Sequence, residues 1–168
     1  MNDSPDPTGR RELRHDTSYL VLTREFRAPV TDVWAAVTES DRLGRWIGTW
    51  TGDPASGSVD FRMTFEGDGS YVGRYDIDVC EPPHRLVLRT HSAGLSWHLE
   101  LHLAEADAVT TLTFAQVMSD PEIAENVGPG WEFYLDRLVA AETGGDVPAI
   151  VFEDYYPGQA DHYRAAFG

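Results

Sequence analysis

The stretch Ala28–Gly48, APVTDVWAAVTESDRLGRWIG, predicts two short helices joined by a tight break, each carrying a tryptophan. Pro29 suits an early helical position because its missing N–H costs nothing there, and Thr31 or Asp32 can cap the exposed amides. Ser40 can cap the second helix, which the closing glycine ends. One face of the first helix is apolar because hydrophobic residues fall three and four apart: Val30, Val33, Trp34 and Val37.

Alternation of apolar and polar residues replaces this helical spacing on both sides of the stretch. It predicts six strands with short connections, which are therefore mostly antiparallel: 19–26, 58–66, 70–80, 85–91, 95–103 and 109–118. A third and longer helix is predicted over 131–142, after Gly128-Pro129-Gly130, with an apolar side that contains Leu135 and Leu138. An antiparallel sheet with one apolar face, covered by one long helix, is the architecture that these elements favour.

Composition bounds the domain organisation and the partners. The chain has 168 residues, 42% of them hydrophobic, which is enough for one core. We expect a disordered segment over 1–18, a domain over 19–145, and an aromatic extension over 146–168 that packs on the domain, because its rings would be costly to leave in water. The net charge of −15 disfavours nucleic acid and membrane as partners. Residues 1–18 lack the apolar centre of a secretory signal, and the single cysteine, Cys80, suits a reducing compartment, so we expect a cytoplasmic protein.

Three pieces of the sequence together carry a family resemblance: APVTDVWAAVTESDRLGRWIG, SYVGRYDIDVCEPPHRLVLRT and GPGWEFYLDRL. With them the chain, from about residue 19 to 142, resembles the START-like helix-grip (SRPBCC) superfamily, and within it homologues of the C-terminal domain of the activator of heat-shock protein 90 ATPase. The resemblance implies an α+β helix-grip fold. In that fold a curved antiparallel sheet, here of about six strands, wraps around a long C-terminal helix over an internal cavity, and two short helices follow the first strand.

Large aromatic rings fall on predicted inward or end-plug positions, and rings fill a small tapered core poorly. They are either simply the core or, as the resemblance favours, the lining of a ligand pocket. Gln116 lies on the apolar side of the last strand, where a buried amide needs a partner and could orient a ligand carbonyl or hydroxyl; its alternative partner is the backbone of the end plug. His91 and Tyr75 are further polar candidates that could equally face solvent. The predicted ligand-binding set is Trp34, Trp46, Trp50, Phe61, Phe65, Tyr75, His91, Trp97, Phe114, Gln116 and Trp131.

Other chemistry-bearing patterns have simpler explanations. His98 and His102 in HLELH would suit zinc on a helix, but alternation predicts a strand, which separates them by about 13 Å at about 3.3 Å per residue. Cys80 has no flanking basic group to lower its pKa and is interpreted as structural. The sequence contains neither G-x-G-x-x-G nor a Walker loop. We therefore expect no metal and no cofactor.

Three functions remain open. The first and favoured one is binding of a small hydrophobic molecule, such as a lipid, an isoprenoid or an aromatic metabolite. The second is an enzyme resembling polyketide cyclases and aromatases, which would need an inward acid–base residue that the pattern does not supply. The third is a protein-interaction module that acts on a chaperone ATPase, as a homodimer or with a protein partner.

Overall fold

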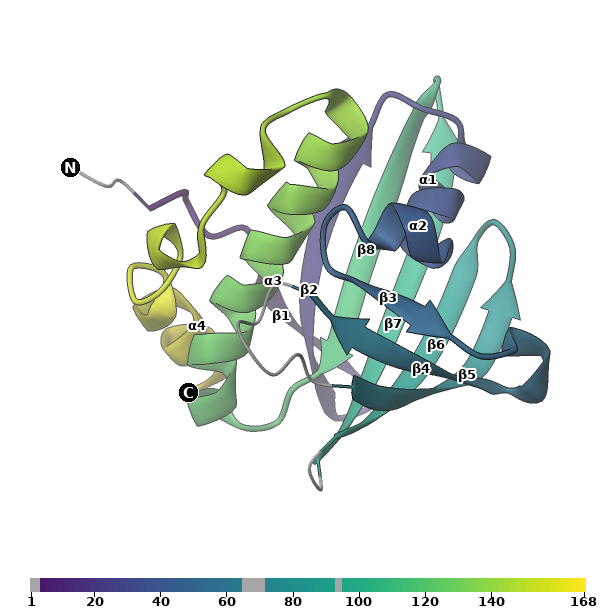
Figure 1. The fold of residues 1–168 in the computed structure, drawn as a ribbon. Coiled ribbons are helices and arrows are strands. Elements are labelled where there is room, and N and C mark those ends of the chain that lie inside the picture. Colours follow the sequence, from purple (N-terminus) through teal and green to yellow (C-terminus); the bar gives the residue numbers. More distant parts are fainter. Residues whose placement is uncertain (1–3, 65–71, 93–94) are drawn as a thin grey trace. The chain divides into compact units, whose positions relative to one another are not determined.

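Eight strands form one sheet in the computed structural model, which describes residues 4–64, 72–92 and 95–168 (Figure 1). The strand order is β1-β2-β8-β7-β6-β5-β4-β3, so β1 and β3 are the edges. The predicted α+β class, with an antiparallel sheet and one long C-terminal helix, is confirmed. The sheet has eight strands where about six were predicted. By its contacts the chain divides into a terminal unit, Met1–Arg24 with Ala115–Gly168, and a central unit, Glu25–Phe114.

The central unit contains the two short helices and the part of the sheet from β8 to the β3 edge. Its elements are α1 (Val30–Thr38), α2 (Ser40–Leu43), β3 (Gly48–Thr51), the 3-10 turn η1 (Pro54–Ser56), β4 (Ser58–Met63), β5 (Val72–Glu81), β6 (Arg85–Ser92), β7 (Leu95–Ala106) and most of β8 (Val109–Val117). Antiparallel pairing joins β3 to β4, β4 to β5, β5 to β6 and β6 to β7. A bulge between Ile77 and Val79 shifts the register of β5 against β6, and bulges of this kind bend a strand.

The terminal unit contains both ends of the chain. Its elements are β1 (Arg10–Arg14), most of β2 (Thr17–Phe26), the last residues of β8, α3 (Pro121–Thr143), the 3-10 turns η2 (Val147–Ala149) and η3 (Phe152–Asp154), and α4 (Ala160–Phe167). Figure 1 shows α4 and the 3-10 turns lying beside α3. None of the helices in the described part of the chain is long and apolar enough to cross a membrane.

The two short helices form where the sequence predicts them, but the residues predicted to cap their first-turn N–H groups do not do so. Neither Thr31 nor Asp32 caps α1; instead the Val30 N–H donates to a carboxylate oxygen of Glu105 at 2.6 Å. Ser40 likewise provides no helix cap, since its hydroxyl binds the backbone of Trp50. In α1 a distant residue thus takes the place of the local cap that the sequence pattern suggested.

The long helix begins ten residues before its predicted start at Trp131. Asp120 is its N-cap, accepting from the Glu122 N–H at 2.9 Å, and Pro121 occupies the first turn, where proline is favoured. The run Gly128-Pro129-Gly130, which was predicted to precede the helix, lies inside it. Gly144, at φ +77°, ends the helix in the left-handed conformation that glycine adopts readily.

The N-terminal segment is ordered in the structure from the first described residues, although it was predicted to be disordered. Arg10–Arg14 pairs with β2 in a hairpin whose turn residues, His15 and Asp16, have φ of +49° and +66°. Two consecutive positive φ angles are typical of a type I′ turn, whose twist matches that of paired strands. At the other end of the chain, side chains of residues 146–168 are buried in the structure, among them Tyr155, Gln159, Tyr163 and Phe167.

Candidate functional site

Two of the predicted site tryptophans contact the end of helix α1. The indole N–H of Trp46 donates to the Ala36 carbonyl at 3.1 Å, and that of Trp50 donates to the Thr38 carbonyl at 2.8 Å. These carbonyls belong to the last turn of the helix, where no intrahelical donor remains. Trp46 is buried and Trp50 half-buried, so both rings close the helix end in addition to any contact with a ligand.

Trp46→Phe should lower the free energy of unfolding by about 1–3 kcal/mol, because it removes the donor and leaves a buried carbonyl unsatisfied. Urea denaturation measures this loss. The matched control is Trp34→Phe in α1, since the Trp34 indole makes no hydrogen bond with the described residues. Equal losses for the two variants would mean that the Trp46 hydrogen bond contributes nothing.

Strand register places four predicted aromatic residues on one face of the central-unit sheet. Trp50 lies opposite Phe61, Tyr75 lies opposite Val59 and Thr90, and Thr90 lies opposite Trp97. Residues two apart on a strand share a face, so Trp50, Phe61, Tyr75 and Trp97 all point to the same side. Phe61 and Tyr75 stack, with ring centroids 4.8 Å apart and planes 13° apart. The central unit thus presents an aromatic face.

The remaining predicted residues of the central unit do not all join this face. Phe114 is buried, at 2% exposure. Phe65 lies outside the described residues. His91 points to the opposite, charged face of the sheet, where its Nε2 is 2.8 Å from a carboxylate oxygen of Asp76. This hydrogen bond is the main cause that lowers the pKa of Asp76. His91 therefore belongs to a partly exposed hydrogen-bonded pair on that face.

In the terminal unit the structure brings the last two predicted residues together. The carbonyl oxygen of the Gln116 amide accepts the indole N–H of Trp131 at 2.7 Å, and Gln116 is only 1% exposed. The amide nitrogen of Gln116, which carries two hydrogen-bond donors, takes no part in this hydrogen bond. Tyr134 extends the site: its ring centroid lies 6.2 Å from that of Trp131. Sequence reasoning missed Tyr134, although its spacing three residues after Trp131 places both on one side of a helix.

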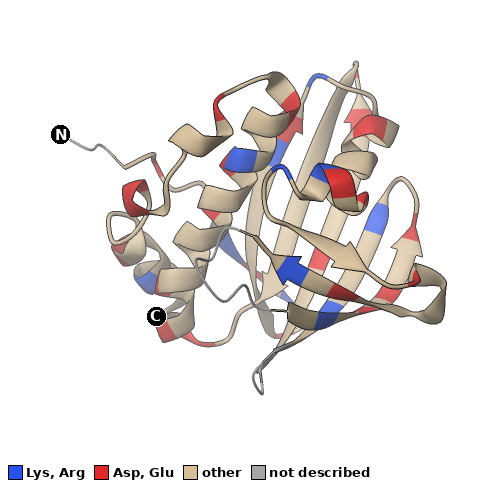
Figure 2. Ribbon diagram, viewed as in Figure 1, with Lys and Arg blue, Asp and Glu red and all other residues tan. Residues whose placement is uncertain are grey.

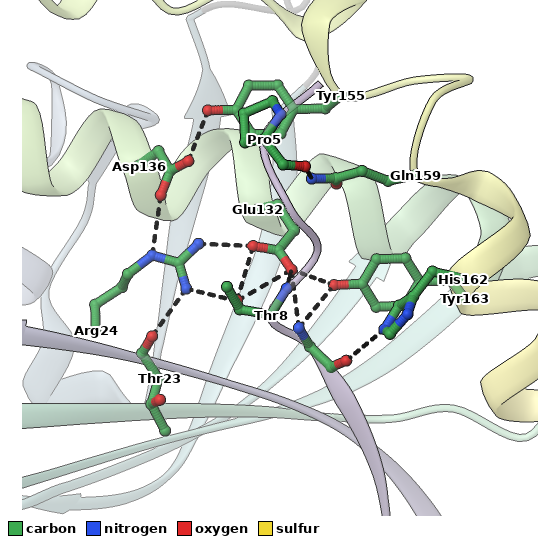
Figure 3. Close-up of polar contacts among 11 residues, drawn as sticks. Pro5, Thr8, Thr23, Arg24, Glu132, Asp136, Tyr155, Gln159, His162 and Tyr163 are labelled. Carbon is green, nitrogen blue, oxygen red and sulfur yellow. Dashed lines mark hydrogen bonds and ion pairs between the residues drawn. The ribbon is translucent and has the colours of Figure 1, made fainter. Parts of the chain in front are cut away.

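A second polar cluster is built around Glu132, the residue that follows Trp131 on α3 (Figure 3). The Glu132 carboxylate accepts hydrogen bonds from the backbone N–H groups of Thr8 and Gly9, from the Arg24 guanidinium at 2.8 Å, and from the Tyr163 hydroxyl. Burial raises the pKa of Glu132, but these hydrogen bonds together outweigh burial and hold it below its ordinary value. All of these described donors come from the N-terminal or the C-terminal part of the chain. We interpret this cluster as the clasp of the terminal unit and use that name below.

The clasp has a second carboxylate. Asp136 accepts from Arg24 at 3.0 Å and from the Tyr155 hydroxyl at 2.7 Å. Burial, and then the hydrogen bond to Asp136, raise the pKa of Tyr155 well above its usual range. No residue of the clasp belonged to the predicted ligand-binding set. The sequence did not indicate the clasp, because Thr8 and Gly9 lie in the segment that was predicted to be disordered.

Comparison with known families decides the relationship. The family model described as "Activator of Hsp90 ATPase homolog 1-like protein" matches residues 27–142. The chain belongs to this family. The predicted resemblance is thereby confirmed. No match was found among curated proteins.

Solved structures extend the comparison of this family member. CalU16 from Micromonospora echinospora is 26% identical, with a TM-score of 0.73 over 96% of this chain and 97% of CalU16. DynU16, a protein of the dynemicin biosynthetic locus, is 27% identical with a TM-score of 0.66, over 77% of this chain and 49% of DynU16. A protein from Bordetella parapertussis has a TM-score of 0.70 at 22% identity, over 96% of this chain and 93% of its own, and shows the fold alone.

Proposed function

We propose that this protein binds a small hydrophobic molecule that carries a carbonyl or hydroxyl group, and that Gln116 and Trp131 provide its polar contact. The buried Gln116–Trp131 hydrogen bond carries the proposal. An amide at 1% exposure in an apolar setting is costly unless it is satisfied, and here one bond satisfies its oxygen while its nitrogen retains two donors. A ligand oxygen is a partner that this nitrogen could take.

The surroundings of the pair favour a ligand with an apolar body. Trp131 and Tyr134 present rings beside the amide, and aromatic rings with few polar groups are typical of small-molecule sites. The aromatic face of the central unit has the same character. Among the relatives, the location of DynU16 in a biosynthetic locus supports a small molecule over a protein partner.

Testing the polar contact requires care with stability. Gln116→Leu alone removes the acceptor of the Trp131 indole and should lower the free energy of unfolding by about 1–3 kcal/mol. The double variant Gln116→Leu/Trp131→Phe removes donor and acceptor together, which can be nearly neutral for stability. It is the better variant for binding experiments.

We expect the double variant to weaken a ligand bearing a carbonyl or hydroxyl by about 0.5–1.5 kcal/mol while scarcely changing the affinity of its hydrocarbon analogue. Fluorescent fatty acids, flavonoids and polyketide-like phenols are suitable probes for titration. If none of them binds the wild-type protein saturably, the proposal fails. If both members of a polar–apolar pair weaken equally, the protein binds ligands but Gln116 and Trp131 are not the polar contact.

A further inference from the structure

A second candidate site lies on the opposite face of the central-unit sheet. A surface depression of about 490 Å³ is lined by Arg85 of β6, His102 of β7, and Thr111 and Thr113 of β8. Its volume lies within the range of about 300–1,000 Å³ that small-molecule sites occupy. In the β6–β7 ladder, Arg85 pairs with His102, and Thr90 pairs with Trp97. Five residues, an odd number, separate the two pairs along each strand, so the pairs lie on opposite faces of the sheet. The depression is therefore separate from the aromatic face.

A buried carboxylate orients the imidazole at this depression. Glu100, 8% exposed, lies two residues before His102 on the same face of β7, and its two oxygens lie 3.5 Å from the His102 Nε2 and 3.0 Å from the His98 Nε2. A carboxylate only accepts, so it favours the tautomer that presents Nε2–H to it. In a neutral imidazole of this tautomer, Nδ1 is a hydrogen-bond acceptor. Glu100 is thus a positioning residue for an acceptor on His102.

The charges around the depression indicate which class of ligand it can bind. Arg85 already faces the Glu81 carboxylate at 3.4 Å, and Glu100 adds a further negative charge behind His102. The formal charges of Arg85, Glu81 and Glu100 sum to −1, which opposes an anionic ligand, in a chain of net charge −15. The Arg85–Glu81 contact is exposed on both sides, so it is weak and leaves guanidinium donors for a ligand oxygen. Pro82 and Ala104 add apolar surface to the lining.

We propose that this depression binds an uncharged aromatic hydroxy compound. The ring hydroxyl donates its hydrogen bond to the Nδ1 of His102, and Arg85, Thr111 and Thr113 supply donors to the ligand's remaining oxygens. An acceptor held by a buried carboxylate, next to donors and an apolar wall, matches a phenol better than it matches a carboxylate or a hydrocarbon. The site is independent of the proposed Gln116–Trp131 contact.

Three matched probes test the ligand class: 2-naphthol, 2-methoxynaphthalene and naphthalene-2-carboxylate. Binding is followed by backbone amide and histidine side-chain NMR. We expect 2-naphthol to shift the signals of His102, Thr111 and Thr113 saturably, and the methyl ether and the carboxylate to bind at least tenfold more weakly at these residues. The histidine side-chain spectrum of the free protein should show His102 as the Nε2–H tautomer.

Two histidine variants separate binding from sheet structure. His102→Phe should weaken 2-naphthol at least tenfold. His98→Phe is the matched control, because His98 shares Glu100 but does not line the depression, and it should retain the affinity within twofold. Gln116→Leu/Trp131→Phe should also leave binding at the depression unchanged, which distinguishes this proposal from the proposed function.

Several results would overturn the proposal. These are an absence of saturable 2-naphthol binding, equal affinity for the methyl ether, tighter binding of the carboxylate, or an Nδ1–H tautomer of His102. If naphthol shifts only the signals of Gln116 and Trp131 and His102→Phe changes nothing, this site is excluded while the proposed function stands.

Discussion

Gly128→Ala should destabilise the protein by about 1–3 kcal/mol or more, although the position is in the interior of α3, where alanine is normally preferred to glycine by about 1 kcal/mol. A Cβ built on Gly128 would lie 2.3 Å from Cγ of Tyr163, with the ring's Cδ atoms at 2.4 and 2.5 Å. Real Cβ atoms do not approach so closely. The ring cannot move aside easily, because Tyr163 is 0% exposed and its hydroxyl is bound to Glu132 and Gly9.

The same helix offers a matched control in Gly130. A Cβ at this glycine would meet nothing within 4 Å, so Gly130→Ala should stabilise the protein by about 0.5–1 kcal/mol through helix propensity alone. Urea denaturation of both variants measures the contrast. Opposite signs for the two substitutions support the packing of Tyr163 against Gly128, and two stabilised variants would contradict it.

This close packing also explains why the helix predicted from the sequence is shorter than α3. Glycine and proline are local helix breakers, so Gly128-Pro129-Gly130 was interpreted as the turn before the helix. In the structure Asp120 and Pro121 start the helix earlier, and Gly128 is the residue that allows Tyr163 to approach. The pairing of residues 128 and 163 is a tertiary contact, and a local pattern carries no information about it.

Strand β1 was missed for a related reason. RRELR shows no apolar alternation, and an edge strand is held mainly by backbone pairing with one neighbour. Its hairpin turn uses His15-Asp16, whereas the sequence signal for a type I′ turn is Asn-Gly or Asp-Gly. Side-chain contacts reinforce the hairpin, with the Arg14 guanidinium 4.7 Å from the Tyr19 ring. Such contacts depend on the register of pairing, which the sequence alone does not reveal.

The part of the candidate site that lies on strands could be predicted from the sequence, because side chains alternate between the two faces of a strand. The shared face of Phe61, Tyr75 and Trp97 follows from alternation within each strand. Gln116 was recognised as a buried amide, but its partner was not, because Trp131 lies on a different element. His91 was left open between the pocket and solvent, because the strand from Arg85 onward shows no alternation that assigns a face to its polar residues; in the structure it lies on the charged face beside Asp76. Burial of polar groups is therefore predictable here, and their pairing is not.

Glu132→Ala should lower the free energy of unfolding by about 3–5 kcal/mol, because it removes the common acceptor of the clasp. The donors left without it are the N–H groups of Thr8 and Gly9, the Tyr163 hydroxyl and part of the Arg24 guanidinium, and those of Gly9 and Tyr163 are buried (Figure 3). Arg24 keeps its bond to Asp136, which limits the loss. Chemical denaturation measures the effect.

Glu125→Ala is the control for Glu132→Ala, since it also removes a glutamate of α3 from an arginine pair. The Arg164 side chain of that pair is 54% exposed, and exposed pairs contribute about 0–1 kcal/mol. A similar loss for both variants would mean that the clasp contributes no more than a surface ion pair.

The clasp also predicts how stability depends on pH. Because the folded protein holds the pKa of Glu132 below its ordinary value of 4.5, the ionised carboxylate stabilises the folded state at pH values above 4.5. That contribution is lost as the pH falls below 4.5 through the lower folded pKa. The isosteric variant Glu132→Gln cannot ionise, so the difference in unfolding free energy between it and the wild type should be largest near neutral pH and should shrink on acidification. Melting curves of both proteins from pH 7 to pH 3, about the span over which such carboxylates titrate, test this. A difference that stays constant across that span would show that the charge of Glu132 does not stabilise the clasp.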